Sequence, residues 1–342
     1  MEVTILSQQS VQKLFELFDQ GTMLLQSALN SSYLDAMLEN AENIIDNNTV
    51  RVEDGVPDKE TQEKLAKIYK QLDLKNVNAE AIRQLIQLSF LKVIRKDAIQ
   101  ANHQMTPDTI GLLMAFLIEK VTKNTKIKTI FDPAVGTANL LTTVINQLDK
   151  DEHENIQGFG IDNDDSMLSV ASVNVALQHA NVDLFHQDSI SALDIPQCDL
   201  AVSDLPIGYY PLDNNTKDYQ TRAKEGHSFV HHLLIEQSMN YLKPGKFGVF
   251  LVPSSLFQTK EAEGFIKWVH SVAYLQGFVN LPAELFANPA AQKSILLLQR
   301  HGGDSKQAAK VLLGEFPSFK DKNKFASFMQ EINDWVTTNI NK

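Results

Sequence analysis

The stretch from Ile127 to Leu148, IKTIFDPAVGTANLLTTVINQL, contains the pattern that decides the fold. A short apolar run ends at Asp132, and an amphipathic segment begins a few residues later, after Pro133 and Gly136. Glycine lets the backbone adopt conformations closed to other residues and approach a ligand closely. The stretch therefore predicts a strand, a glycine turn and a helix, and the free amides at the start of such a helix are suited to ligand binding.

The alternation of strand and helix patterns continues to about residue 302. The later apolar runs are IQGFGID, VDLFHQD, CDLAVSD, GKFGVFLVP, AYLQGFVNL and SILLLQR. Helical stretches, among them SMLSVASVNVALQHA and SFVHHLLIEQSMNYL, separate most of these runs. Such alternation indicates a mostly parallel sheet with helices on both faces. Because only a loop separates the last two runs, we expect an α/β fold with a seven-stranded doubly wound sheet whose last strand is antiparallel.

The two ends of the chain show helical patterns only. Up to residue 100, apolar residues recur at three- and four-residue spacing, and Asn78 is placed to cap the segment AEAIRQLIQLSFLKVIRK. After residue 302, the stretch FPSFKDKNKFASFMQEINDWV predicts one terminal helix. The sequence thus predicts an all-helical N-terminal domain (residues 1–100), an α/β domain (101–302) and a helical C-terminal tail (303–342).

Composition limits the class of protein. The fractions of hydrophobic (43%) and charged (21%) residues are ordinary for a globular domain. No apolar run approaches the roughly 18–20 residues that span a bilayer, and the start lacks the features of a signal peptide. A single cysteine suits a reducing compartment, so we expect a cytoplasmic protein without a membrane partner. The net charge of −11 argues against broad polyanion binding, although a local basic groove remains compatible with it.

Acidic residues end the first three predicted strands. They are Asp132, Asp162 and Asp188, and ligands of doubly wound sheets bind at the carboxyl ends of the strands. The second carboxylate is placed to bind two ribose hydroxyls, and the third to accept from an adenine amino group. Each acid alone is more often a helix cap or a loop residue, but together with the glycine turn the three predict an adenosine-type ligand. The spacing is not G-x-G-x-x-G, which disfavours a dinucleotide. The histidines form no recognisable metal set, so no metal site is predicted.

Several segments, in order, resemble those of a known family. DPAVGTANLL, GFGIDNDDSMLSVASVNVAL, the Asp188 loop and CDLAVSDLPIGYYP resemble motifs I to IV of S-adenosylmethionine-dependent methyltransferases. The match is closest to the N6-adenine DNA methyltransferases related to the modification subunits of type I restriction systems. Upstream, NHQMTPDTIGLLMAFLI resembles the family's motif X. The resemblance covers residues 100 to 302 and implies a class I (Rossmann-like) methyltransferase fold with S-adenosylmethionine as the cofactor.

The resemblance also assigns cofactor-binding residues by matched position. Those that would contact the methionine part are Gln104, Thr106 and Pro107. The cofactor turn would consist of Asp132, Pro133, Ala134, Gly136 and Thr137. Asp162 would bind the ribose, and Asp188 would bind the adenine.

Motif IV is altered. In the family it reads Asn, Asp or Ser, then two prolines, then an aromatic residue that stacks on a flipped base. Here the corresponding residues are Asp204, Leu205, Pro206 and Ile207, followed by Gly208, Tyr209 and Tyr210. An adenine amine is a weak nucleophile, and acceptors at the first side chain and the second carbonyl would polarise it. Asp204 and Leu205 keep both acceptors, whereas Ile207 supplies no ring. Tyr209 or Tyr210 is the candidate replacement, and the resemblance gives Asp204, Leu205, Pro206 and Tyr209 as catalytic residues.

Three functions remain open at the level of sequence. The leading hypothesis is an N-methyltransferase of the adenine-N6 DNA type. The second keeps the cofactor but methylates RNA, protein or a small molecule, and the third is a regulatory protein that binds the cofactor without turnover. If DNA is the substrate, the tail after residue 302 is too short for a DNA-reading domain. Target choice must then come from the helical N-terminal domain, from the loops or from another chain, and a separate specificity subunit or a second copy of the chain is the candidate partner.

Overall fold

The computed structural model describes residues 8–97, 105–149, 155–286 and 291–340. These residues form two compact units, each with its own hydrophobic core. One unit consists of the described residues within 1–105, 136–146 and 164–181, and the other of those within 106–135, 147–163 and 182–342. The second unit contains the whole sheet and most of the predicted site residues.

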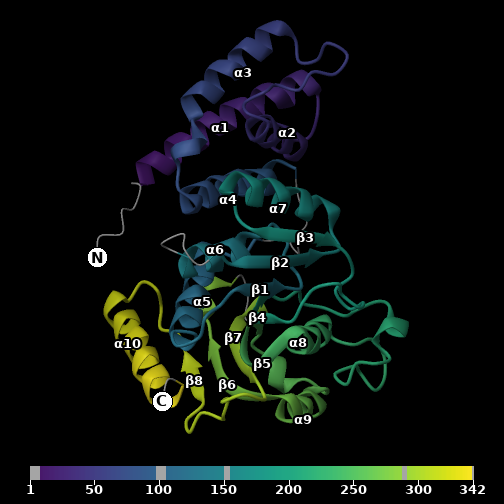
Figure 1. Ribbon diagram of the computed structural model, residues 1–342, viewed down its shortest axis with the longest axis vertical. Coiled ribbons are helices and arrows are strands. Elements are labelled where there is room, and N and C mark those ends of the chain that lie inside the picture. Colours follow the sequence, from purple (N-terminus) through teal and green to yellow (C-terminus); the bar gives the residue numbers. More distant parts are fainter. Residues whose placement is uncertain (1–7, 98–104, 150–154, 287–290, 341–342) are drawn as a thin grey trace. The chain divides into compact units, whose positions relative to one another are not determined.

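The sheet has eight strands in the order β3-β2-β1-β4-β5-β7-β6-β8 (Figure 1). Their bounds are β1 (Thr129–Asp132), β2 (Gln157–Asp162), β3 (Val182–His186), β4 (Cys198–Asp204), β5 (Leu242–Pro253), β6 (Ala273–Asn280), β7 (Lys293–Arg300) and β8 (Leu312–Glu315). The first five strands pair in parallel, and β7 lies antiparallel between β5 and β6. The predicted seven-stranded doubly wound sheet with its antiparallel last strand is confirmed.

The eighth strand is an addition to the prediction. β8 pairs in parallel with β6, in the part of the chain where we expected helix and tail. It is four residues long, and Leu313 is 68% exposed, so the segment lacks the buried alternation that marks a strand in sequence. The expected terminal helix follows as α10 (Lys322–Asn339).

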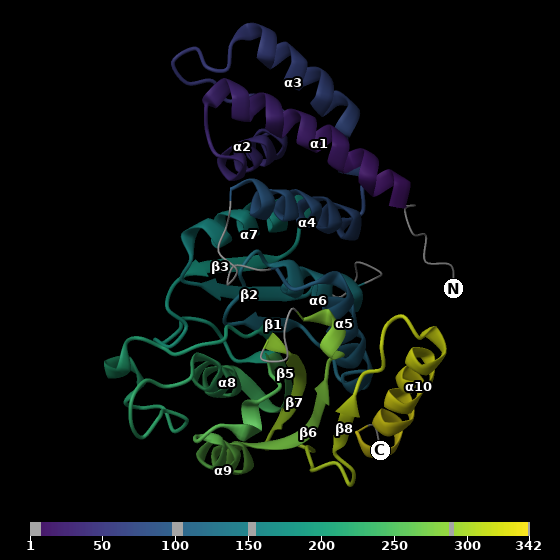
Figure 2. The same ribbon diagram turned by 180° about the vertical axis from the view of Figure 1, so that it is seen from behind.

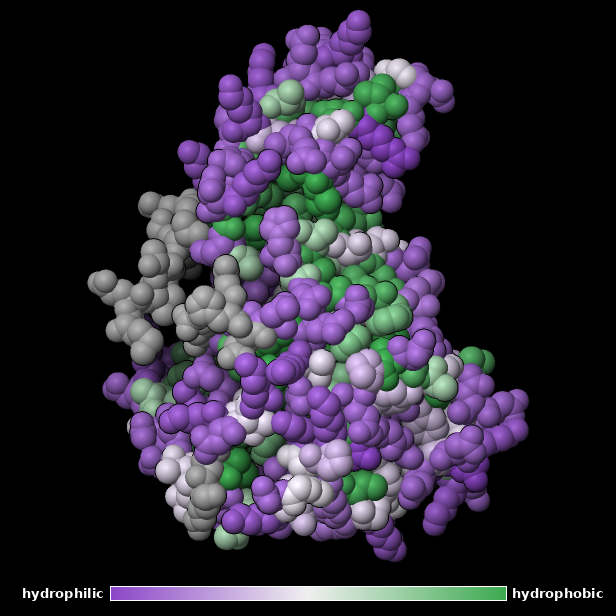
Figure 3. All heavy atoms as spheres, in the orientation of Figure 1, coloured by the Kyte–Doolittle hydropathy of each residue, from purple (hydrophilic) through white to green (hydrophobic). Residues whose placement is uncertain are grey.

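Three further helices belong to the sheet-containing unit: α5 (Asp108–Val121), α8 (Val230–Tyr241) and α9 (Ala262–Val272). Helix α8 contacts β1, β4 and β5, and α9 contacts β6, so both cover the same core (Figure 2). Short 3-10 turns occur at Asp213–Thr216, Leu256–Gln258 and Ala283–Leu285. Polar residues dominate the face of this unit seen in Figure 3. Among the described residues, no helix is both long and apolar enough to cross a membrane.

The other unit is helical, and besides the predicted N-terminal helices it contains two from the segment that we assigned to the α/β domain. It consists of α1 (Gln8–Leu29), α2 (Tyr33–Ile45), α3 (Lys59–Leu72), the 3-10 turn Leu74–Asn76, α4 (Ala79–Lys96), most of α6 (Asn139–Leu148) and α7 (Asp165–Gln178). The predicted N-cap is confirmed, because the Asn78 side chain accepts a hydrogen bond from the amide of Ala81 at 2.8 Å. Such caps satisfy amides that the first helical turn leaves unpaired.

A buried arginine ties α4 to the start of α6 within this unit. The Arg83 side chain is fully buried, pairs with Glu80 at 2.6 Å, and donates to the side chain of Asn139 at 2.7 Å. A buried charge is tolerated only when it is paired and hydrogen-bonded. The helical N-terminal region therefore fixes the first residue of α6, directly after the turn that follows β1.

Candidate active site

The site is built at one edge of the sheet. The parallel strands β1, β2 and β4 end there at Asp132, Asp162 and Asp204. Strand β7 runs in the opposite direction and begins at the same edge, where Lys293 pairs with Pro253, the last residue of β5. Three carboxylates and one ammonium group thus come from four strands that lie close together in the sheet order.

Asp132 is the buried centre of this edge. Its side chain is 1% exposed and accepts hydrogen bonds from the Ser203 hydroxyl at 2.7 Å and the Ala134 amide at 3.0 Å. Burial, with a smaller contribution from the charges of Asp162 and Asp204, raises the pKa of Asp132 to about 7. The two hydrogen bonds oppose this rise. The structure therefore brings three of the predicted acids into one electrostatic group.

The raised pKa of Asp132 predicts a pH dependence of stability. Between the ordinary value of 3.8 and the raised value of about 7, the folded protein holds a proton that the unfolded chain releases. The contribution of this proton to the free energy of unfolding is therefore complete below pH 3.8, and it is lost as the pH rises toward about 7. Asparagine does not titrate, so Asp132→Asn removes this loss. The difference in free energy of unfolding between the variant and the wild type should therefore shift by about 2–3 kcal/mol in favour of the variant when the pH is raised from 5 to 8. Denaturant unfolding of both proteins without cofactor, at pH 5 and at pH 8, measures this difference. An equal change in the free energy of unfolding of both proteins would contradict the prediction.

The turn after β1 has the backbone that the sequence predicts. Gly136 has φ +52°, the left-handed region that glycine enters without strain, and Ala138 follows with φ +60°. On β2, an added Cβ at Gly160 would lie 2.8 Å from the side chain of Val135 and 2.9 Å from that of Leu184. Only glycine at position 160 leaves room for the side chain of Val135 to pack against β2.

The loop after β3 carries Asp188 and is bonded to its neighbours on both sides. One carboxylate oxygen of Asp188 accepts from the amide of Ile190 at 3.0 Å, and the other accepts from the Tyr210 hydroxyl. The hydroxyl of Ser189 donates to the carbonyl of Pro133 at 2.5 Å, which joins this loop to the residues after β1. Since a carboxylate offers about four lone-pair directions, Asp188 keeps capacity for a further donor.

Asp204, the first residue of the altered motif, is held from two sides. Thr106 donates its hydroxyl to one carboxylate oxygen at 2.8 Å, and Lys293 forms an ion pair with the other. The side chains of Asp204 and Lys293 are only 18% and 20% exposed, so water screens this pair weakly. Leu205 is buried, and its amide donates to the carbonyl of Leu251 at 3.0 Å, which fixes the backbone behind Asp204.

An aromatic pair lies in the segment that follows. The Tyr209 side chain is 62% exposed and stacks on Phe229, with ring centroids 4.8 Å apart and an interplanar angle of 20°. Phe229 in turn contacts the ring of His231 at 5.2 Å. Burial, with the nearby charge of Lys293, lowers the pKa of His231 to about 4, so this ring is neutral at pH 7. Tyr209 and Phe229 thus pair near the two ends of the loop that joins β4 to α8, the loop that begins directly after Asp204.

The remaining predicted residues are placed as follows. Gln104 lies outside the described residues. Pro107 is exposed and directly precedes α5, and its carbonyl accepts from the amides of Ile110 and Gly111. Pro206 is exposed in the loop after β4, and Ile207 beside it is 54% exposed. Tyr210, in contrast to Tyr209, is buried and points to Asp188.

Sequence reasoning missed Lys293 and Phe229. Lys293 lies 89 residues from Asp204 in the chain, but the predicted direction of β7 was a usable signal. The first residue of an antiparallel strand lies at the same edge as the last residues of the parallel ones. Phe229 has no comparable signal, because its contact with Tyr209 depends on the path of a long loop.

Comparison with known proteins agrees with this geometry. The family model described as N-6 DNA Methylase matches residues 90–339, and the model of the YtxK N-terminal helical domain matches residues 12–94. The uncharacterised protein YtxK of Bacillus subtilis is 34% identical over 321 residues, which cover 94% of this chain and 96% of YtxK.

Solved structures give the same result. A Listeria monocytogenes protein assigned to the class I S-adenosylmethionine-dependent methyltransferases is 40% identical, with a TM-score of 0.88 over 96% of this chain and 100% of that one. A protein of Vibrio vulnificus assigned as a modification subunit of a type I restriction enzyme has a TM-score of 0.63 at 14% identity, over 87% of this chain and 65% of its own. At that identity the second similarity shows the fold alone.

The chemistry at the sheet edge fits the cofactor that these relatives imply. S-adenosylmethionine carries hydroxyl and amino donors and a sulfonium cation, and the edge offers carboxylates with lone-pair capacity at the ends of successive strands. S-adenosylmethionine is therefore the cofactor. Together, the fold, the strand-end acids and the matches over most of its length show that the chain belongs to the N-6 DNA methylase family of S-adenosylmethionine-dependent methyltransferases.

Proposed function

We propose that the protein methylates the exocyclic amino group of adenine in DNA, in the cytoplasm. One observation carries the proposal: Asp204 is held at the end of β4 by Thr106 and Lys293, and the loop that follows it presents the exposed Tyr209 ring. Methylation of an adenine amine requires a fixed acceptor for the amine hydrogens and a ring on which the flipped base stacks.

In this proposal the strand-end acids bind the cofactor. Asp162 accepts from the ribose hydroxyls and Asp188 from the adenine amino group. The turn of Asp132, Pro133, Ala134, Gly136 and Thr137 lies against the cofactor's methionine part, together with Gln104, Thr106 and Pro107. When bound, S-adenosylmethionine supplies an electrophilic methyl group on sulfur.

The acceptor amine is polarised by two oxygens. Asp204 and the carbonyl of Leu205 accept its hydrogens, which pulls the nitrogen toward a tetrahedral geometry and stabilises the positive charge that develops on it. Both oxygens of Asp204 already have a donor, but each has a second lone pair. Pro206 limits the freedom of the backbone after these two acceptors.

Tyr209 replaces the missing ring of motif IV in this account, which predicts a specific loss. Tyr209→Ala should lower kcat/KM for DNA by about 5- to 150-fold, because a base–aromatic stack contributes about 1–3 kcal/mol. Tyr209→Phe keeps the ring and serves as the matched control, with a rate close to that of the wild type. Steady-state kinetics with a duplex oligonucleotide measures both, and an alanine variant as active as the phenylalanine variant would contradict the stacking role.

The ion pair at Asp204 favours one other candidate, a regulatory protein that binds S-adenosylmethionine without turnover. Lys293 places a positive charge against the carboxylate that an amine must reach, and Ile207 offers no ring beside it. A cation there opposes the positive charge that develops on a methylated amine. Cofactor binding without transfer to DNA, RNA or protein would favour this candidate.

Sequencing the modified bases of the native genome, with and without the gene, tests the proposed function. Loss of N6-methyladenine at a defined set of sites would support it, and an unchanged pattern would reject DNA as the acceptor. We further propose that a separate specificity chain, or a second copy of this one, selects those sites. Co-purification from native cells, followed by mass measurement of the assembly, tests that proposal.

A further inference from the structure

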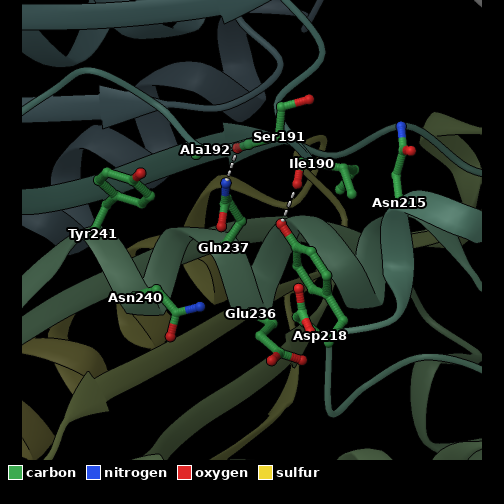
Figure 4. A pocket seen from close by; sticks show the side chains of 10 residues that line it. Ile190, Ser191, Ala192, Asn215, Asp218, Glu236, Gln237, Asn240 and Tyr241 are labelled. Atoms are coloured by element: carbon green, nitrogen blue, oxygen red, sulfur yellow. Dashed lines mark hydrogen bonds between the residues drawn. The ribbon is translucent and has the colours of Figure 1, made fainter.

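The segment Pro206–Phe229, which joins β4 to α8, is here named the acceptor loop. Its neighbour is the adenine loop, Gln187–Leu193, which follows β3 and contains Asp188. The two loops and α8 surround a cavity of about 430 Å³, shown in Figure 4. Hydrogen bonds that cross between these three segments hold the acceptor loop against the proposed adenine site.

Tyr210 makes the most direct of these bonds. Its side chain is 6% exposed, and its hydroxyl donates to the carboxylate of Asp188. The Asn215 amide donates to the same hydroxyl at 3.0 Å. Burial and the charge of Asp188 raise the pKa of Tyr210 to about 12, so the hydroxyl keeps the proton that it donates.

Other bonds support the same arrangement from the cavity side. Tyr219, also in the acceptor loop, donates to the carbonyl of Ile190 at 2.9 Å. From α8, Gln237 donates to the carbonyls of Ser189 and Ser191 at 2.8 and 2.7 Å. The carboxylate of Glu236, next on the same helix, accepts from two amides of the acceptor loop, those of Gln220 and Thr221.

We propose that Tyr210 is a positioning residue that couples cofactor binding to closure of the acceptor loop. By donating to one oxygen of Asp188, it sets the orientation of the carboxylate that receives the cofactor's adenine. The adenine in turn fixes Asp188 and so strengthens the anchor of the loop. Each event favours the other by the same free energy, as linkage requires. The inference rests on the proposed role of Asp188, but not on the identity of the methyl acceptor.

Limited proteolysis with trypsin, with and without S-adenosylhomocysteine, tests the coupling. Lys217, Arg222 and Lys224 are exposed in the acceptor loop and report its closure. In the wild type, the ligand should slow cleavage at these positions at least about tenfold, because cleavage tracks the population of the open form. In Tyr210→Phe this protection should be largely lost, and the Kd for S-adenosylhomocysteine should rise about tenfold, the effect of one hydrogen bond to a charged group.

Tyr274→Phe, a matched change on β6, should keep both the wild-type Kd and the wild-type protection. If Tyr210→Phe does not fold, Asn215→Ala removes only the bond to the Tyr210 hydroxyl and should weaken protection in the same direction. A wild-type loop whose cleavage ignores the ligand would overturn the inference, and so would a Tyr210→Phe variant with unchanged Kd and protection. Neither readout needs a methyl acceptor, so failure of DNA methylation would be seen separately.

Discussion

Asp204→Ala is expected to lower methyl transfer to DNA by about 10²–10³-fold, the effect of removing one group that stabilises a developing charge. Cofactor affinity should change less than the rate does, because Asp204 is assigned to the acceptor and touches the cofactor residues only through its hydrogen bond from Thr106. The substitution also leaves the ammonium group of Lys293, whose side chain is only 20% exposed, without its anion. Since an unpaired buried charge is destabilising, the unfolding free energy should be measured before the rates are compared.

Asp204→Asn is the matched control. Asparagine keeps an oxygen in the acceptor position, and it is one of the residues that the family uses there. The asparagine variant should therefore retain far more activity than the alanine variant under single-turnover conditions. Equal rates for the alanine variant and the wild type would exclude Asp204 as the acceptor of the amine hydrogens.

Asp162→Ala is expected to raise the Kd for S-adenosylmethionine by about 10²-fold. The carboxylate is proposed to accept from two ribose hydroxyls, and a hydrogen bond to a charged group contributes about 1.5–3 kcal/mol. Isothermal titration calorimetry measures the change directly. Asp183→Ala, which removes an exposed carboxylate near the start of β3, is the control and should bind as the wild type does. An unchanged Kd in Asp162→Ala would remove Asp162 from the cofactor site.

Much of the fold is predictable because it depends on local patterns. Each predicted strand of the sheet is present, and the acids at the strand ends follow from the direction of parallel strands. The cap at Asn78 depends only on the three residues after it. Strand β8 escaped prediction because it is short and exposed, and pairing with β6 is what makes it a strand.

The residues proposed to face the methyl acceptor were less predictable, because their positions depend on contacts between distant segments. Tyr209 and Tyr210 are adjacent and identical in type, yet one ring is exposed on Phe229 and the other is buried against Asp188. Their directions are set by the path of the acceptor loop, which no periodicity encodes. Likewise, the pairing of Lys293 with Asp204 requires the register of β5 with β7.

A methyl-transfer assay is the most direct test of the proposal that the protein methylates the adenine amino group in DNA. The purified protein is incubated with S-adenosylmethionine labelled in its methyl group and with DNA that lacks adenine methylation. The DNA is then digested to nucleosides and analysed by mass spectrometry. The account predicts labelled N6-methyladenine in the wild-type reaction and its near absence with Asp204→Ala. Cofactor binding in the normal range with no label in any nucleoside would contradict it.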